Sequence, residues 1–93
     1  QFLKAQAHHL KPTLYIGKAG VTEALLQELD QTLDALELLK IKLNQNTFED
    51  EASVVDVLVR RLEGVEHVWT IGHTILIFRP SRTHPTRYPL PDR

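Results

Sequence analysis

Residues 14–22 read LYIGKAGVT: a short apolar run, a G-x-x-G tetrapeptide and the start of a strongly periodic helical pattern. This order predicts a strand that turns through Gly17 and Gly20 into a helix. Two such glycines let the backbone turn sharply and leave its amides uncovered. The helix adds unpaired N–H groups and a positive dipole end, and Lys18 adds a cation, so the junction predicts a phosphate contact. A plain tight turn is the alternative.

The loop does not fit the common nucleotide-binding motifs. A Walker sequence requires Ser or Thr after Gly-Lys, whereas Ala19 follows Lys18 and no glycine precedes Gly17. A dinucleotide fingerprint also fails, because the second of its three glycines is missing. The interpretation that remains is direct contact between the loop amides and a phosphodiester.

The first half of the chain carries two helical patterns around this junction. Residues 1–11 predict a helix that Pro12 stops, and residues 13–16 predict a strand. Thr22 suits the N-cap of a second helix with one apolar face, formed by Leu25, Leu26, Leu29, Leu33 and Leu36. The outer face of this helix is acidic and carries Glu23, Glu28, Asp30, Asp34 and Glu37.

The second half predicts a strand, a helix and a hairpin. Residues 38–44 alternate as a half-buried strand does. Thr47 and Asp50 resemble a capping box, so a third helix is expected to run to Gly64 with an apolar stripe of Ala52, Val55, Leu58, Val59 and Leu62. Residues 67–71 and 74–78 form a hairpin, and the second strand is apolar on both faces, which is typical of a central strand.

The resulting order, α-β-α-β-α-β-β, predicts an α/β fold of two layers. The second and third helices should cover one face of a four-stranded mixed sheet, with helix-linked neighbours parallel and one hairpin strand antiparallel. Residues 1–80 make the domain. Four prolines keep residues 81–93 and the residue before them extended, so we expect a tail there.

Composition limits the possible classes of protein. Ninety-three residues suffice for one domain, and the absence of Cys excludes disulfides, a thiolate nucleophile and Cys-based zinc sites. No apolar run approaches the ~20 residues that cross a bilayer, and no signal peptide opens the chain. We expect a cytoplasmic monomer that binds no membrane; since the chain has no Met, we also expect a trimmed N-terminus.

The formal net charge of −1 conceals an uneven distribution. Residues 1–22 contain three lysines and no acid, and residues 72–91 contain three arginines and no acid. Residues 23–71 contain eleven acids against four basic residues. This asymmetry predicts one basic and one acidic face; the alternative is that both terminal segments are simply solvated.

Two groups of basic residues are candidates for contact with nucleic acid. Lys4, His8 and Lys11 form a stripe on the first predicted helix, which ends just before the strand that leads to Lys18. Phosphate contacts by such groups position RNA without reading its sequence. Lys40 and Lys42 share a strand face with Tyr15, and alternation adds Trp69 and Phe78, a mixture suited to base stacking or to ordinary packing under another element.

Metal and catalytic sites find no support. His8 and His9 point about 100° apart on a helix, and the other three histidines have no ligand spacing. Ser53 and Ser81 lack a nucleophile-elbow context, and residues 49–51 are acids at a helix start, where they stabilise the dipole. We therefore expect no metal, no cofactor and no enzymatic activity.

Several motifs in register resemble the CRM domain, the chloroplast RNA splicing and ribosome maturation module, in its stand-alone bacterial YhbY-like form. They are AHHLKP at 7–12, IGKAG at 16–20, ELLKIK at 37–42, IGHTILIFRP at 71–80 and YPLP at 88–91. The resemblance implies a fold like the C-terminal domain of translation initiation factor three and binding to RNA of large ribosomal subunit precursors. It also implies a KH-like G-x-x-G clamp on the RNA backbone at Gly17, Lys18, Ala19 and Gly20, with Lys11 beside it.

The chain departs from this family in two respects. Family members tend to be more basic, and the first helix begins late. The alternative to RNA binding is a protein-interaction module that uses the acidic outer face of the second helix.

Overall fold

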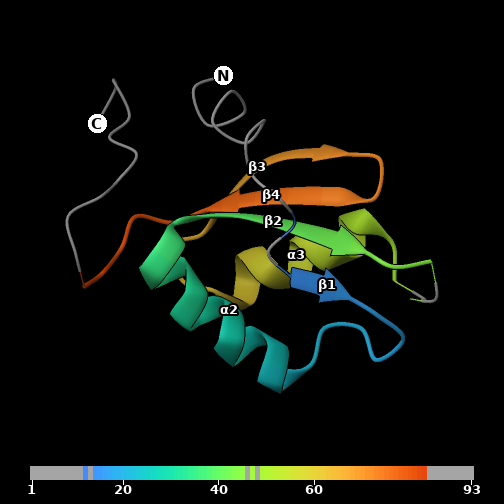
Figure 1. Cartoon of the computed structure of the whole chain (residues 1–93), viewed down its shortest axis with the longest axis horizontal. Coiled ribbons are helices and arrows are strands. Elements are labelled where there is room, and N and C mark those ends of the chain that lie inside the picture. Colours follow the sequence, from blue (N-terminus) through green and yellow to red (C-terminus); the bar gives the residue numbers. More distant parts are fainter. Residues whose placement is uncertain (1–11, 13, 46, 48, 84–93) are drawn as a thin grey trace.

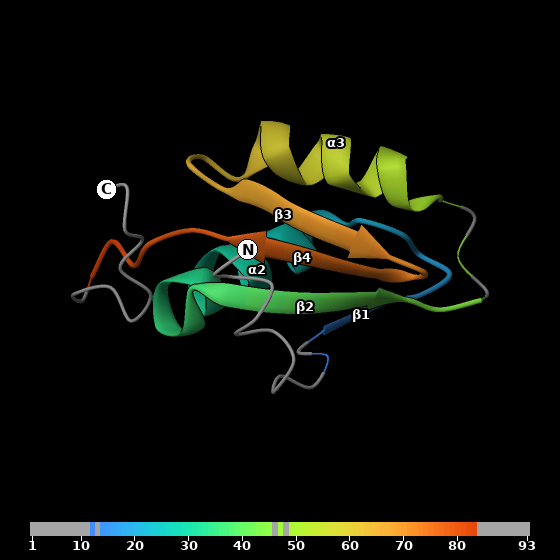
Figure 2. The same cartoon turned by 90° about the horizontal axis from the view of Figure 1, so that it is seen from above.

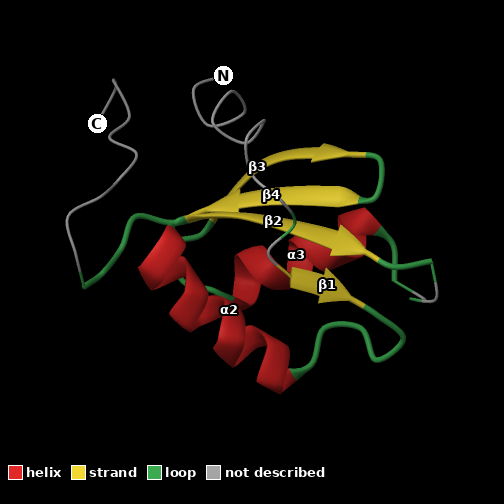
Figure 3. Cartoon of the chain, in the orientation of Figure 1, coloured by secondary structure: helices red, strands yellow, loops and turns green. Residues whose placement is uncertain are grey.

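The computed structural model describes residues 12, 14–45, 47 and 49–83, which form two layers (Figure 1). The elements are β1 (Leu14–Ile16), α2 (Glu23–Leu36), β2 (Leu38–Leu43), α3 (Glu51–Arg61), β3 (Glu66–Ile71) and β4 (Thr74–Phe78). Both helices cover one face of the sheet (Figure 3). The predicted two-layer α/β fold is confirmed, while the helix predicted at residues 1–11 lies outside the described residues.

The four strands lie in the order β1-β2-β4-β3. β1 pairs with β2 in parallel, whereas β4 pairs antiparallel with both β2 and β3. β4 is therefore a central strand, as its two apolar faces predicted. β3 carries a register shift between His67 and Trp69. Both antiparallel pairs of the mixed sheet thus involve β4, the second strand of the β3–β4 hairpin.

The main core lies between the sheet and the two helices. α2 packs against β2, and α3 packs against β3 and β4 (Figure 2). The largest fully buried side chains of this core come from every element except β3 and are Ile16, Leu29, Leu33, Leu39, Ile41, Val54, Leu58, Ile75 and Ile77. Side chains that alternate with them point to the opposite sheet face, where Leu38, Leu76 and Phe78 form a second buried cluster.

The start and the buried stripe of α3 differ from the sequence-based prediction. Asp50, not Thr47, is the N-cap, because its carboxylate accepts the Ser53 N–H at 2.8 Å. The helix ends at Arg61, short of Gly64. Val54, Leu58 and Leu62 are buried and the predicted Val55 packs against the same core, whereas the predicted Ala52 and Val59 are exposed. The run from Ala52 to Val59 is apolar on several sides, so docking against the sheet selects the buried face.

Arg79, directly after β4, is a buried residue at the centre of an ion-pair cluster. Its guanidinium donates to Asp30 Oδ1 and the Asp30 carbonyl, both at 2.8 Å, and more weakly to Asp34 and the Glu63 carbonyl. Arg82 joins the same two carboxylates at 2.9 and 2.8 Å. We call Asp30, Asp34, Arg79 and Arg82 the Arg79 cluster. It ties α2 and the turn before β3 to the chain that follows β4.

The end of α2 is unusual because Glu37 replaces the glycine common at such ends. Its φ is +68°, a left-handed conformation, and its side chain is buried. Glu37 Oε2 accepts the Ser81 N–H at 2.6 Å, and its carbonyl accepts the Arg79 N–H at 3.0 Å. The expected position of Glu37 on the outer acidic face of α2 is therefore wrong: its carboxylate and its carbonyl hold Ser81 and Arg79, at the junction between the predicted domain and the predicted tail, against the end of the helix.

The Arg79 cluster predicts loss of stability in acid. Hydrogen bonds from Arg79, then Arg82, lower the pKa of Asp30, and hydrogen bonds from Arg82 lower that of Asp34. Because the unfolded carboxyls bind protons at higher pH than the folded ones, their contribution is complete above pH ~4 and is lost as pH falls through the folded pKa. Urea midpoints should therefore drop below pH 4, and Asp34→Asn should flatten that drop. Equal slopes for the variant and the parent would contradict this assignment.

Candidate nucleic-acid interface

One end of the sheet gathers three connections. β1 and β2 are parallel, so their carboxyl ends meet at the same edge, where the Asn44 N–H donates to the Ile16 carbonyl at 2.8 Å. The turn of the β3–β4 hairpin arrives there too, since the Leu43 N–H donates to the His73 carbonyl at 2.8 Å. We call this the loop end (Figure 1). Residues 17–20, the β2–α3 connection and the hairpin turn meet at it.

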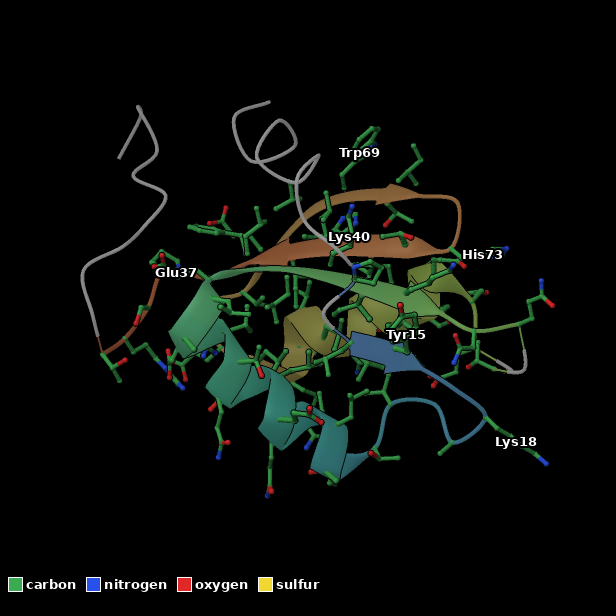
Figure 4. The ribbon with its side chains drawn as sticks, viewed as in Figure 1. Tyr15, Lys18, Glu37, Lys40, Trp69 and His73 are labelled. Carbon is green, nitrogen blue, oxygen red and sulfur yellow. The ribbon has the colours of Figure 1, made fainter. Side chains whose placement is uncertain are left out.

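The G-x-x-G loop is a tight turn with an exposed tip. The Gly20 N–H donates to the Gly17 carbonyl at 3.0 Å, and Gly20 has a φ of +70°. Lys18 and Ala19 are exposed at the tip, and Lys18 points away from the body of the domain (Figure 4). Within the part of the chain that the structure describes, Lys18 has no hydrogen bond or ion pair. Its ammonium group is available to an anion.

Thr22 caps α2 as the sequence predicted, with its Oγ1 accepting the Leu25 N–H at 3.1 Å. The backbone N–H of Val21, the residue before this cap, is bonded to a side chain from another part of the chain. The Glu49 carboxylate, from the β2–α3 connection, accepts the Val21 N–H at 2.8 Å. A Cβ on Gly20 would collide with the same carboxylate oxygen. Glu49 therefore supports the loop through the Val21 N–H. This amide, at the junction where the sequence predicted a phosphate contact, is not available to a phosphate.

The sequence offered no signal for this role of Glu49. It lies 28 residues from Val21 and appeared as one acid among three at a helix start. Only the parallel pairing of β1 with β2 brings the two connections together. Because Glu49 occupies the Val21 side, the groups left open to an anion are Lys18 and the exposed backbone at the tip.

The basic and aromatic residues of the sheet share one face, as alternation predicted. Register places Tyr15 beside Lys42, and Lys40 in one row with Leu76 and Trp69. Their environments differ, however. Tyr15 and Lys42 are exposed, whereas Lys40 is half-buried and Trp69 packs on the second buried cluster.

Phe78 cannot stack on a base, because only 1% of its surface is exposed. The prediction that it joins a stacking surface is wrong, and the alternative of ordinary packing holds for it. The remaining predicted contacts, Lys4, His8 and Lys11, lie outside the described residues.

His73, at the hairpin turn, forms a further polar contact at the loop end. Its Nδ1 lies 2.9 Å from Glu51 Oε2, and this contact lowers the pKa of the Glu51 carboxyl. Within the described ranges, no group of three or more acidic or histidine side chains is arranged to hold a metal ion. Neither α2 nor α3 is long and apolar enough to span a bilayer.

The outer face of α2 is less acidic than its sequence indicated. Asp30 and Asp34 are neutralised in the Arg79 cluster, and Glu37 is buried. Glu23 forms an exposed pair with Arg61 at 2.6 Å. Arg79 and Arg82, two of the three arginines counted in the basic C-terminal segment, therefore form ion pairs with carboxylates of α2. Over the described residues, neither the acidic face nor the C-terminal basic face has the form that charge counting suggested.

Comparison with known proteins extends these observations to a family. The model of the CRS1 / YhbY (CRM) domain matches residues 1–79. YqeI of Bacillus subtilis, named as a probable RNA-binding protein, is 37% identical over 82 residues, which cover 88% of this chain and 84% of YqeI. A protein of Haemophilus influenzae named as an RNA-binding protein is 36% identical over 89 residues, covering 96% of this chain and 89% of that protein.

A solved structure shows the same fold. The solution structure of the hypothetical protein SAV1595 from Staphylococcus aureus matches with a TM-score of 0.76 and 33% sequence identity, and the match covers 97% of this chain and 92% of that one. The likeness therefore spans nearly the whole chain in both sequence and structure.

Proposed function

This chain belongs to the CRS1 / YhbY (CRM) domain family, and from that premise we propose that it is a non-catalytic RNA-binding protein. Relatives that it matches over most of their length are named for RNA binding, which supports RNA as the partner. Residues 1–80 form the binding domain in this proposal, and residues 81–93 form an extended tail. No described feature favours the acidic face of α2 as a protein-binding surface.

The proposed target is ribosomal RNA in precursors of the large subunit, bound in the cytoplasm by one copy of the chain during ribosome assembly. The resemblance of its motifs to the ribosome maturation module supports this target. A domain that positions itself by phosphate contacts suits folded ribosomal RNA, because such contacts follow backbone shape rather than base sequence.

The proposed contact surface is the loop end. Gly17, Lys18, Ala19 and Gly20 approach the RNA backbone in the manner of a KH clamp, with Lys42 and Lys40 on the adjoining sheet face and Lys4, His8 and Lys11 adding charge. The observation that carries this proposal is the exposed Lys18, which has no partner among the residues that the structure describes, at the tip of a tight turn. Glu49 directs the phosphate toward this tip, since a second anion beside its carboxylate is repelled.

Lys18→Glu should weaken RNA binding roughly tenfold at low salt, because it reverses one charge next to a phosphate. It should also make the plot of log affinity against log salt shallower by about 0.7, the value for one lost phosphate contact on a single strand. Filter binding of a large-subunit RNA fragment at several salt concentrations measures both quantities.

Arg60→Glu is the matched control, since it changes the net charge equally from an exposed position on α3. The control should keep both the affinity and the salt slope near those of the parent. If Lys18→Glu binds as tightly as Arg60→Glu, the loop is not the RNA-binding site. Urea unfolding of both variants checks that the fold is retained.

A further inference from the structure

Tyr15 is an exposed aromatic ring in the middle of a strand. Its neighbours Leu14 and Ile16 pack toward the main core, so Tyr15 points to the opposite sheet face, and 54% of its surface is exposed. Among the described residues it has no hydrogen-bond partner. Neither packing nor hydrogen bonding within the described fold accounts for this ring.

The surroundings of Tyr15 are cationic and open. Register places Lys42 beside it, with Thr74 and Ile71 next across the sheet. Lys42 is exposed and has no ion-pair partner among the described residues, and Ile71 is 56% exposed. The row at the other end of this face is different, because Leu38 and Phe78 are buried there. The open part of the face is therefore confined to the end that adjoins the G-x-x-G loop.

Tyr15 also lies close to the loop. Lys18 follows it by three positions, which is about 10 Å at most along an extended chain. Figure 4 shows Tyr15 and Lys18 on the same side of the molecule, with Lys18 beyond the end of β1. An aromatic ring flanked by two free lysines offers a stacking surface for a base and cations for the phosphates on either side of it.

We propose that Tyr15 is the stacking platform for one unpaired RNA base, whose flanking phosphates contact Lys18 and Lys42. The inference rests on the proposed RNA-binding function and adds its substrate class: the bound segment is single-stranded at this nucleotide, because bases inside a duplex do not expose their faces. Stacking tolerates any base, so the platform gives a preference for unpaired RNA rather than for a sequence.

The test compares Tyr15→Ala with Ile71→Ala, a control that removes an equally exposed apolar side chain from the same row without removing an aromatic ring. Tyr15→Ala should weaken binding of a single-stranded RNA at least about fivefold and leave the salt slope unchanged. Tyr15→Trp should restore the affinity, and binding of a fully paired duplex should be the same for all variants. Ile71→Ala should match the parent.

A single-stranded RNA that carries 2-aminopurine reports stacking directly. Its fluorescence should be quenched by the parent and by Tyr15→Trp, but not by Tyr15→Ala. If Tyr15→Ala binds and quenches like the parent while Lys18→Glu is weakened, the platform is wrong and the RNA-binding proposal stands. If Ile71→Ala is as weak as Tyr15→Ala, the face is a general apolar contact and the platform is also wrong. If the parent binds no RNA, the proposed function itself fails.

Discussion

Replacing Arg79 with Met should destabilise the domain by about 3 kcal/mol, the lower part of the range for removing one member of a buried ion pair. The side chain is only 4% exposed. The variant leaves Asp34, whose side chain is 17% exposed, with Arg82 alone as its ion-pair partner, and it removes the hydrogen bonds that Arg79 donates to the Asp30 and Glu63 carbonyls. Met retains much of the buried volume, so the loss reports hydrogen bonds and charge rather than a cavity. Urea unfolding monitored by circular dichroism measures it.

The matched control is Arg60→Met. Arg60 also pairs with an aspartate at 2.8 Å, but its side chain is 68% exposed and that of Asp56 is 66% exposed. Because an exposed pair is hydrated and screened, its loss should cost less than about 1 kcal/mol. Equal losses for the two variants would show that burial of the Arg79 cluster adds nothing to stability.

Gly20→Asp should both abolish RNA binding and destabilise the fold by about 3 kcal/mol. A side chain at a φ of +70° costs about 1 to 2 kcal/mol. The new Cβ displaces the Glu49 carboxylate from the Val21 N–H, which forfeits a further hydrogen bond of about 1 kcal/mol. The added carboxylate also repels Glu49 and any incoming phosphate. Filter binding and urea unfolding measure the two effects.

Gly72→Asp separates these contributions. Gly72 has a φ of +57°, but nothing lies within 4 Å of a Cβ built there. Gly72→Asp should therefore lower the free energy of unfolding only by the cost of placing a side chain at a positive φ. Adding Glu49→Gln to Gly20→Asp should recover part of the stability, since it removes one of two like charges, without restoring binding. If Gly20→Asp lowers the free energy of unfolding no more than Gly72→Asp does, the contact between Glu49 and the loop does not stabilise the fold.

The parts of the fold that the sequence predicted depend on local pattern. The strand, turn and helix around residues 14–36 follow from apolar periodicity, two glycines and the Thr22 cap. The central place of β4 follows from its two apolar faces. The stripe of α3 was misjudged because the run from Ala52 to Val59 offers more than one apolar face, and only packing against the sheet distinguishes them.

The parts that could not be predicted depend on contacts between distant residues. Glu49 reaches the loop across 28 residues, and Arg79 reaches Asp30 across 49. Counting charge along the chain treated Arg79 and Arg82 as free cations and the acids of α2 as a free surface. Once folded, these groups cancel one another. For the candidate site, the sequence predicted Lys18 and the face shared by Tyr15 and Lys42, whereas the exposure that singles out Tyr15 came only from the structure.

The central position of β4 has a consequence for how the chain is made. Among the described strands β4 is the last to leave the ribosome, yet it is the partner of both β2 and β3. Until residues 74–78 have emerged, β2 has a partner only on its β1 side, and β3 has none among the described strands. Such open strand edges are aggregation-prone in nascent chains. The sheet of this domain is therefore complete only when β4 has paired on both sides, and the same pairing delivers Arg79 to α2.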